Sequence, residues 1–118
     1  MNSKQQFRFE SQELGLLGSV LHEVLNGFAI PEFDRRIGMK KADLEDLLKH
    51  LHTLGDRDAV TLDIRQTRAF RNALSETIKE LGAEEFHTRT GYDFGQGNAS
   101  LKRLDQLLGD RPALTGSG

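Results

Sequence analysis

The sequence contains no cysteine and no long apolar run. Without cysteine the chain can form neither disulfide bonds nor thiolate zinc sites, and thiol catalysis is excluded as well. A membrane-spanning helix needs roughly 20 consecutive apolar residues, and no segment approaches that length. The first residues also lack the apolar core of a signal peptide. We therefore expect a cytoplasmic protein that does not associate with membranes.

A strong excess of charge of one sign is also missing. The 118 residues include 16 basic and 18 acidic side chains, for a formal net charge of -2. Because the positive and negative charges nearly cancel, the overall charge favours neither nucleic acid nor an anionic membrane as a partner. The length fits one domain, which we place at residues 1–110, and residues 111–118 are predicted to form a flexible tail.

The two halves of the sequence resemble each other. Residues 7–54 align with residues 60–107 at a shift of 53 positions without a gap, and ten of the 48 aligned positions are identical. The identical pairs are Leu21/Leu74, Glu23/Glu76, Glu32/Glu85, Phe33/Phe86, Arg36/Arg89, Gly38/Gly91, Leu48/Leu101, Lys49/Lys102, Leu51/Leu104 and Leu54/Leu107. An internal duplication is the interpretation we prefer. A unit of about 50 residues buries little apolar surface alone, so we predict that two units share one core about a pseudo-twofold axis.

Both halves follow the same pattern of elements. A short stretch with alternating apolar residues, QFRFE or AVTLD, is typical of a strand with one buried face. Apolar residues then recur every three or four positions, which predicts amphipathic helices, and Asp63 with Gln66 forms a capping-box pattern. The predicted fold is a mostly helical α+β domain of strand–helix–helix repeats, in which the two strands can pair as an antiparallel ribbon.

The frame E-F-x-x-R-x-G occurs once in each half. Its members are Glu32, Phe33, Arg36 and Gly38 in the first half and Glu85, Phe86, Arg89 and Gly91 in the second. A glutamate four residues before an arginine predicts an ion pair along a short helix. We expect the phenylalanine to anchor this turn in the core and the glycine to end the helix in the left-handed conformation. The alternative is that the two arginines bind ligands at symmetric sites.

The segment EFDRRIGMKKADLEDLLKHL, residues 32–51, resembles a helix-turn-helix, the DNA-binding motif of two helices joined by a tight turn. Apolar residues and a turn glycine occupy the positions typical of the motif: Phe33, Ile37, Gly38, Met39, Leu44 and Leu47. The segment differs from the motif at Asp34, where a small apolar residue is usual. Its second helix carries Asp43, Glu45 and Asp46 against Lys40, Lys41 and Lys49, and an acidic face repels phosphate. The resemblance implies a nucleic-acid-binding regulator, whereas our preferred interpretation is that this geometry serves packing.

No group of residues in the sequence predicts catalysis. His50 and His52 are two positions apart, so on a helix they point in nearly opposite directions, and no HExxH metal motif is present. The stretch GYDFGQGN contains glycines but lacks the preceding strand and the lysine of a phosphate-binding loop. We predict no catalytic residues, no metal site and no cofactor, and we expect the chain not to be an enzyme.

The two halves differ most in charge. Arg65, Arg68 and Arg71, here called the arginine trio, fall on one flank of the long helix of the second half, where the first half is uncharged. The first half has Gly15 and Gly18 on this flank, and each glycine costs about 1 kcal/mol of helix propensity relative to alanine. Close approach of another backbone, from the second half, a dimer mate or a partner protein, is the predicted reason for these glycines.

The helix after Gly38 carries an acidic trio, Asp43, Glu45 and Asp46. We predict a non-enzymatic protein that binds another protein, as a monomer or a homodimer. A bacterial immunity or antitoxin protein that blocks a toxic enzyme through charge complementarity fits best. The acidic trio would meet a basic cleft, or the arginine trio an acidic one. A solvated surface of mixed charge is the alternative explanation of both trios, and a nucleic-acid-binding regulator is the alternative function.

Overall fold

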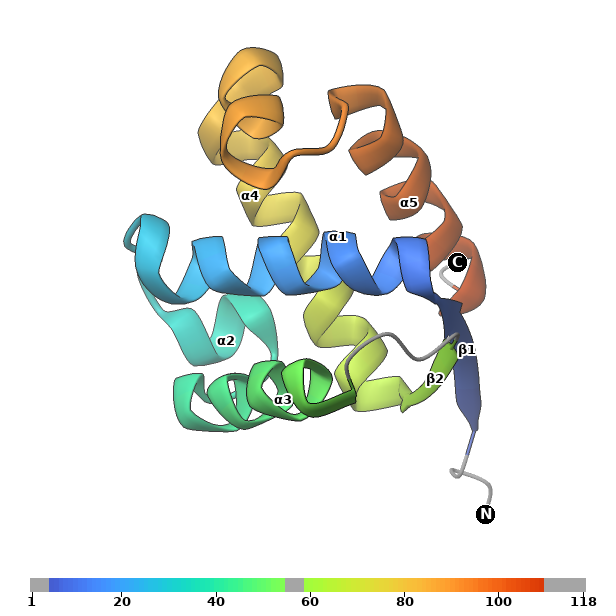
Figure 1. Cartoon of the computed structure of the whole chain (residues 1–118). Coiled ribbons are helices and arrows are strands. Elements are labelled where there is room, and N and C mark those ends of the chain that lie inside the picture. The colour runs from blue at the N-terminus through green and yellow to red at the C-terminus, as the bar shows by residue number, and fades with distance from the viewer. Residues whose placement is uncertain (1–4, 55–58, 110–118) are drawn as a thin grey trace.

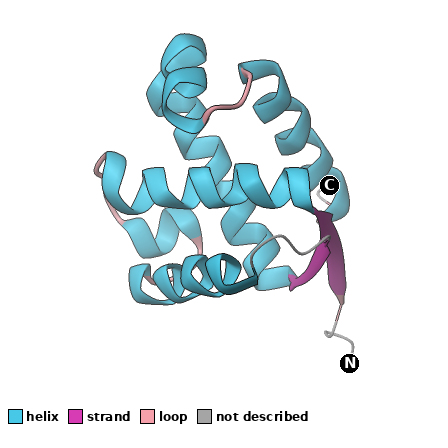
Figure 2. Cartoon of the chain, in the orientation of Figure 1, coloured by secondary structure: helices cyan, strands magenta, loops and turns pink. Residues whose placement is uncertain are grey.

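The computed structural model describes residues 5–54 and 59–109, and it is mostly helical with one small sheet (Figures 1 and 2). The elements in chain order are β1 (Gln6–Glu10), α1 (Ser11–His22), the π-helical turn η1 (Glu23–Gly27), α2 (Phe33–Ile37), α3 (Lys41–Leu54), β2 (Ala59–Asp63), α4 (Ile64–Thr90) and α5 (Phe94–Leu107). The predicted α+β class is confirmed. The predicted tail, residues 111–118, lies outside the described residues.

Strands β1 and β2 form the predicted antiparallel ribbon. Arg8 lies opposite Thr61 at the middle of the ladder, and Phe9 lies opposite Val60. The alternation predicted from the sequence is confirmed. Phe9 and Leu62 are buried, whereas the residues that precede them in their strands, Arg8 and Thr61, are exposed. One face of the ribbon therefore contributes to the core.

The core lies where α1 crosses in front of α4 (Figure 1). The two helices bury their apolar stripes against each other, with Leu17 and Leu21 of α1 and Phe70 and Leu74 of α4 almost fully removed from solvent. The ring of Phe9 meets that of Phe70 edge to face at 5.9 Å, which joins the ribbon to this crossing. The buried residues form one cluster that draws on both halves of the chain.

Left-handed glycines end two of the helical segments, as predicted. Gly38 follows α2 with φ of 89°, and Gly91 follows α4 with φ of 81°. A third glycine, Gly82, bends α4 in its interior, with φ of 72°. The bend divides α4 into a long segment, residues 64–81, and a short one, residues 83–90. The predicted capping box of Asp63 and Gln66 is present at the start of α4.

Elements of the first half and elements of the same type in the second half are separated by the same number of residues. Strand β2 begins and ends 53 residues after β1, and α5 begins and ends 53 residues after α3. The short segment of α4 ends 53 residues after α2, and a left-handed glycine follows in both places. The Arg8–Thr61 pair at the centre of the ribbon has this offset as well.

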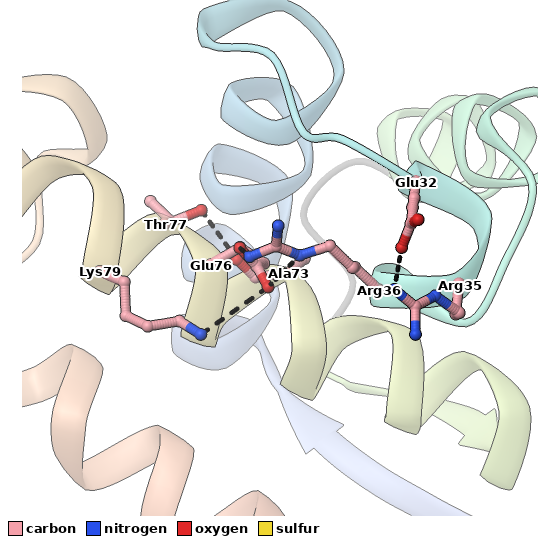
Figure 3. Close-up of polar contacts among 7 residues, drawn as sticks. All are labelled: Glu32, Arg35, Arg36, Ala73, Glu76, Thr77 and Lys79. Carbon is pink, nitrogen blue, oxygen red and sulfur yellow. Dashed lines mark hydrogen bonds and ion pairs between the residues drawn. The ribbon is translucent and has the colours of Figure 1, made fainter.

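The repeated arginines bind glutamates of the opposite half. Arg36 donates two hydrogen bonds to Glu76 of α4, from Nη2 to Oε1 at 3.0 Å and from Nε to Oε2 at 3.2 Å (Figure 3). Arg89 Nη2 lies 2.7 Å from Glu23 Oε1. Glu23 and Glu76 are themselves 53 residues apart. The frame therefore contributes to a crossed set of ion pairs between the halves.

The predicted pair within the first frame is wrong. Glu32 contacts Arg35, the neighbour of Arg36, because Arg36 extends across to α4 (Figure 3). In the second frame the pair of Glu85 and Arg89 is present at 4.0 Å, although the contact of Arg89 with Glu23 is much closer. The phenylalanines also differ, since Phe86 is fully buried and Phe33 is half-buried.

Candidate functional site

The acidic trio lies on the exposed side of α3. Asp43 binds Arg65 of α4, with Oδ2 at 3.3 Å from Nη2. Glu45 and Asp46 are exposed and have no ion pair or hydrogen bond to any side chain in residues 5–54 or 59–109. Two of the three carboxylates are therefore free to interact with a partner.

The arginine trio does not form one continuous surface. Arg65 turns toward α3, where it meets Asp43, whereas Arg71 turns toward α5. There the Nε of Arg71 donates to Asp105 Oδ1 at 2.7 Å and its Nη1 donates to Asn72 Oδ1 at 3.2 Å. Arg68 is exposed and has no such partner in the described part of the chain. The trio thus leaves one free cation.

A hollow of about 640 Å³ lies beside the contact between α1 and α3, and residues of both helices line it. Its size falls within the range of roughly 300–1,000 Å³ that is typical of ligand pockets. Both serines of α1, two histidines and an ion pair line it together with leucines and glycines: Ser11, Leu14, Gly15, Gly18, Ser19, His22, Glu23, Leu51, His52, Leu54 and Arg89. The sequence did not predict this site.

The ion pair in the hollow joins the π-helical turn η1, which contains Glu23, to the end of α4, which contains Arg89. Glu23 begins this turn and is 6% exposed, and its Oε1 accepts no hydrogen bond of good geometry despite the 2.7 Å contact with Arg89. Arg89 also donates to the backbone oxygen of Gly27 at 3.3 Å. A side chain at Gly27 would collide with both charged groups. Such π-turns within helices often occur at functional sites.

The two glycines of α1 have different surroundings. A Cβ atom at Gly15 would collide with the hydroxyl of Tyr92, so a side chain and not a backbone makes the close approach there. A Cβ atom at Gly18 would meet nothing within 4 Å. Among the described residues the predicted close approach by a backbone of the second half is therefore wrong at both positions, while close approach of a dimer mate or a partner protein stays a prediction. The packing of the described residues does not require glycine at Gly18.

Replacing Gly18 with alanine should stabilise the protein. The expected gain is about 1 kcal/mol in the free energy of unfolding, because alanine has the higher helix propensity and the added methyl group faces open space. Gly15→Ala is the matched control and should gain less, because Tyr92 must move. Urea denaturation of both variants measures the difference, and equal gains would contradict the described surroundings of the two glycines.

Metal-binding clusters and membrane-spanning helices are not found in the described chain. In residues 5–54 and 59–109 no three histidine, aspartate or glutamate side chains come together in a way that could hold a metal ion. His22 and His52 both line the hollow, but on different helices. Within the same residues no helix, not even the 27-residue α4, combines the length and the apolar character needed to cross a membrane.

Comparison with known proteins assigns no relatives, since no protein-family model, no curated protein and no solved structure matches the chain.

Proposed function

We propose that this chain is a non-enzymatic protein-binding module that covers a basic surface of its partner with the exposed side of α3. Among proteins of this kind, a bacterial immunity or antitoxin protein that neutralises a toxic enzyme fits best. The observation that carries the proposal is the free state of Glu45 and Asp46. In the arginine trio, by contrast, internal carboxylates hold Arg65 and Arg71. Complementary charge accelerates association and selects the partner.

We also infer that the module arose by duplication of a strand–helix–helix unit whose copies pack about a pseudo-twofold axis. The common offset of 53 residues supports this inference, because it relates strands, helices and terminal glycines alike. The crossed ion pairs support it further, since Arg36 with Glu76 and Glu23 with Arg89 exchange places under the same offset. A duplicated core leaves the two outer surfaces free to acquire different charges.

A nucleic-acid-binding regulator is the second candidate, and it depends on α2, Gly38 and α3. These elements have the order of a helix-turn-helix, and Lys41 at the start of α3 lies 5.6 Å from the ring centre of Phe33 in α2. The second helix of such a motif reads DNA with its exposed side. In this chain that side carries Glu45 and Asp46, which repel phosphate. The exposed Lys49 lies on the same helix, so it is these two free carboxylates, and not the net charge of α3, that favour a basic protein partner.

Reversing the free charges of α3 should abolish neutralisation. We expect the double variant Glu45→Lys/Asp46→Lys to bind a basic toxin domain encoded beside this gene about tenfold more weakly or worse, and to lose protection of cells that express the toxin. Glu80→Lys/Glu84→Lys is the matched control, because these α4 glutamates are also exposed and free of ion pairs within the described residues.

Growth protection and a titration of the purified proteins measure both effects. Equal protection by the α3 variant and the α4 control would refute the role of α3. Salt-sensitive binding of the unaltered protein to DNA or RNA, without any protection, would instead favour the second candidate.

A further inference from the structure

The hollow at Gly18 is filled by an arginine at the corresponding place of the second half. The offset of 53 residues relates Gly18 to Arg71, and it relates α1 and α3 to α4 and α5. Arg71 extends from α4 to α5 and places its guanidinium group against Asp105 and Asn72. Between α1 and α3, where glycine replaces this arginine, the structure has an open hollow instead.

Hydrogen-bond acceptors remain in place around the hollow. His52 stands at the position of Asp105, and Ser19 stands at the position of Asn72. Both line the hollow, and neither has a side-chain hydrogen bond in the described part of the chain. A neutral imidazole nitrogen and a hydroxyl oxygen can each accept an N–H group. The hollow therefore keeps acceptors at both positions that hold the guanidinium group of Arg71.

The charges at the hollow favour a cation over an anion. Arg89 is the cation that lines it, and two carboxylates already flank this guanidinium group, Glu23 at 2.7 Å and Glu85 at 4.0 Å. The three groups together carry one negative charge. Glu23 is also nine-tenths buried, and its Oε1 still lacks a hydrogen bond of good geometry. An added guanidinium group can supply N–H donors, and the two carboxylates offset its repulsion by Arg89, whereas an added carboxylate supplies no donor and adds to the negative charge.

We propose that the hollow binds an arginine side chain of the partner protein, which lies over Gly18 with its guanidinium group between Ser19 and His52. The inference deepens the proposed function, because a partner with a basic surface supplies such an arginine. It also gives Gly18 a reason, since any larger side chain at this position would occupy the space that the arginine takes. The free carboxylates Glu45 and Asp46 belong to α3, and other residues of the same helix line the hollow.

A capped arginine, N-acetyl-arginine methylamide, tests the hollow without the partner. In ¹⁵N-resolved NMR titrations of the full chain we expect saturable shifts of the amides of Gly18, Ser19 and His52, with a dissociation constant in the millimolar range. The uncharged isostere, capped citrulline, should bind at least tenfold more weakly. Equal responses to the two probes, or no saturable response to capped arginine, would overturn the proposal.

Three variants make the assignment specific. Gly18→Arg should abolish the response, because its own side chain fills the hollow, whereas Gly95→Arg should retain it, since Gly95 is an equally open helical glycine on α5. His52→Asp places a carboxylate where α5 has Asp105 and should tighten binding of capped arginine several-fold. A response that survives in Gly18→Arg, or affinity unchanged in His52→Asp, would overturn the proposal.

The outcomes separate this inference from the proposed function. If the charge reversal at Glu45 and Asp46 leaves neutralisation intact while capped arginine still binds at Gly18, the proposed function fails and the arginine site stands. If neutralisation depends on those carboxylates but capped arginine does not bind, the proposed function stands and the arginine site fails.

Discussion

Division of the chain between residues 54 and 59 should destroy the cooperative fold of both pieces, and mixing the pieces should restore it. Each piece keeps one strand and its helices but loses the helix that covers its apolar stripe, since α1 buries Leu17 and Leu21 against Phe70 and Leu74 of α4. A single piece of about 50 residues also buries too small a fraction of its surface to be stable alone.

Circular dichroism at micromolar concentration measures this effect. The separate pieces should have little helical signal and no cooperative thermal transition, and an equimolar mixture should recover both. A cooperative transition of either piece as a monomer would show that each half has a core of its own. A mixture whose signal equals the sum of its components would show that the halves do not depend on each other.

Truncation of Phe86 should strongly destabilise the protein. The ring is fully buried, lies edge to face on Phe94 at 5.8 Å, and packs so closely on Gly97 that a Cβ atom there would come within 2.6 Å of it. We expect Phe86→Ala to lower the free energy of unfolding by about 3–5 kcal/mol. That loss is a large part of the roughly 5–15 kcal/mol that stabilises a typical domain.

Phe33→Ala is the matched control for this substitution. Phe33 occupies the same place in the repeated frame, but it is half-buried and borders Lys41 at the surface. We expect it to cost about 1–2 kcal/mol, because less apolar area returns to water. Urea denaturation of the two variants gives the comparison, and equal losses would contradict the different burial of the two phenylalanines.

Local features of the fold were predictable because their causes are local. The strands follow from alternating apolar residues, and the capping box follows from Asp63 and Gln66 at the correct spacing. The left-handed glycines at Gly38 and Gly91 follow from the steric cost of a Cβ atom in that conformation. The bend of α4 at Gly82 was not predicted, since the apolar periodicity continues up to that residue.

The partners of the repeated arginines were not predictable from local rules. The i,i+4 rule considers only neighbours along a helix, whereas Arg36 binds a residue 40 positions away. A signal was nevertheless present, because Glu23 and Glu76 are one of the ten identical pairs of the two halves. An acidic residue at the same position among the apolar helix positions of both halves indicates a partner that is distant in sequence.

The hollow beside Gly18 could not be predicted from the sequence either. The sequence identified Gly15 and Gly18 as costly helix positions but could not distinguish the one that meets Tyr92 from the one that faces open space. Nor does any pattern in the sequence announce the π-helical turn that places Glu23 beside Arg89. Both features depend on how elements from the two halves pack together.

The side chain of Arg71 has a consequence for assembly. A protein that arose by duplication, as we propose for this chain, could offer two equal binding sites, and a bivalent molecule can bridge two partners and build larger complexes. Here one of the two related places is filled by the chain's own Arg71, held by Asp105, and the other is open at Gly18. For the interaction proposed at Gly18, this asymmetry limits each chain to one partner arginine and favours closed, one-to-one complexes over chains of linked molecules.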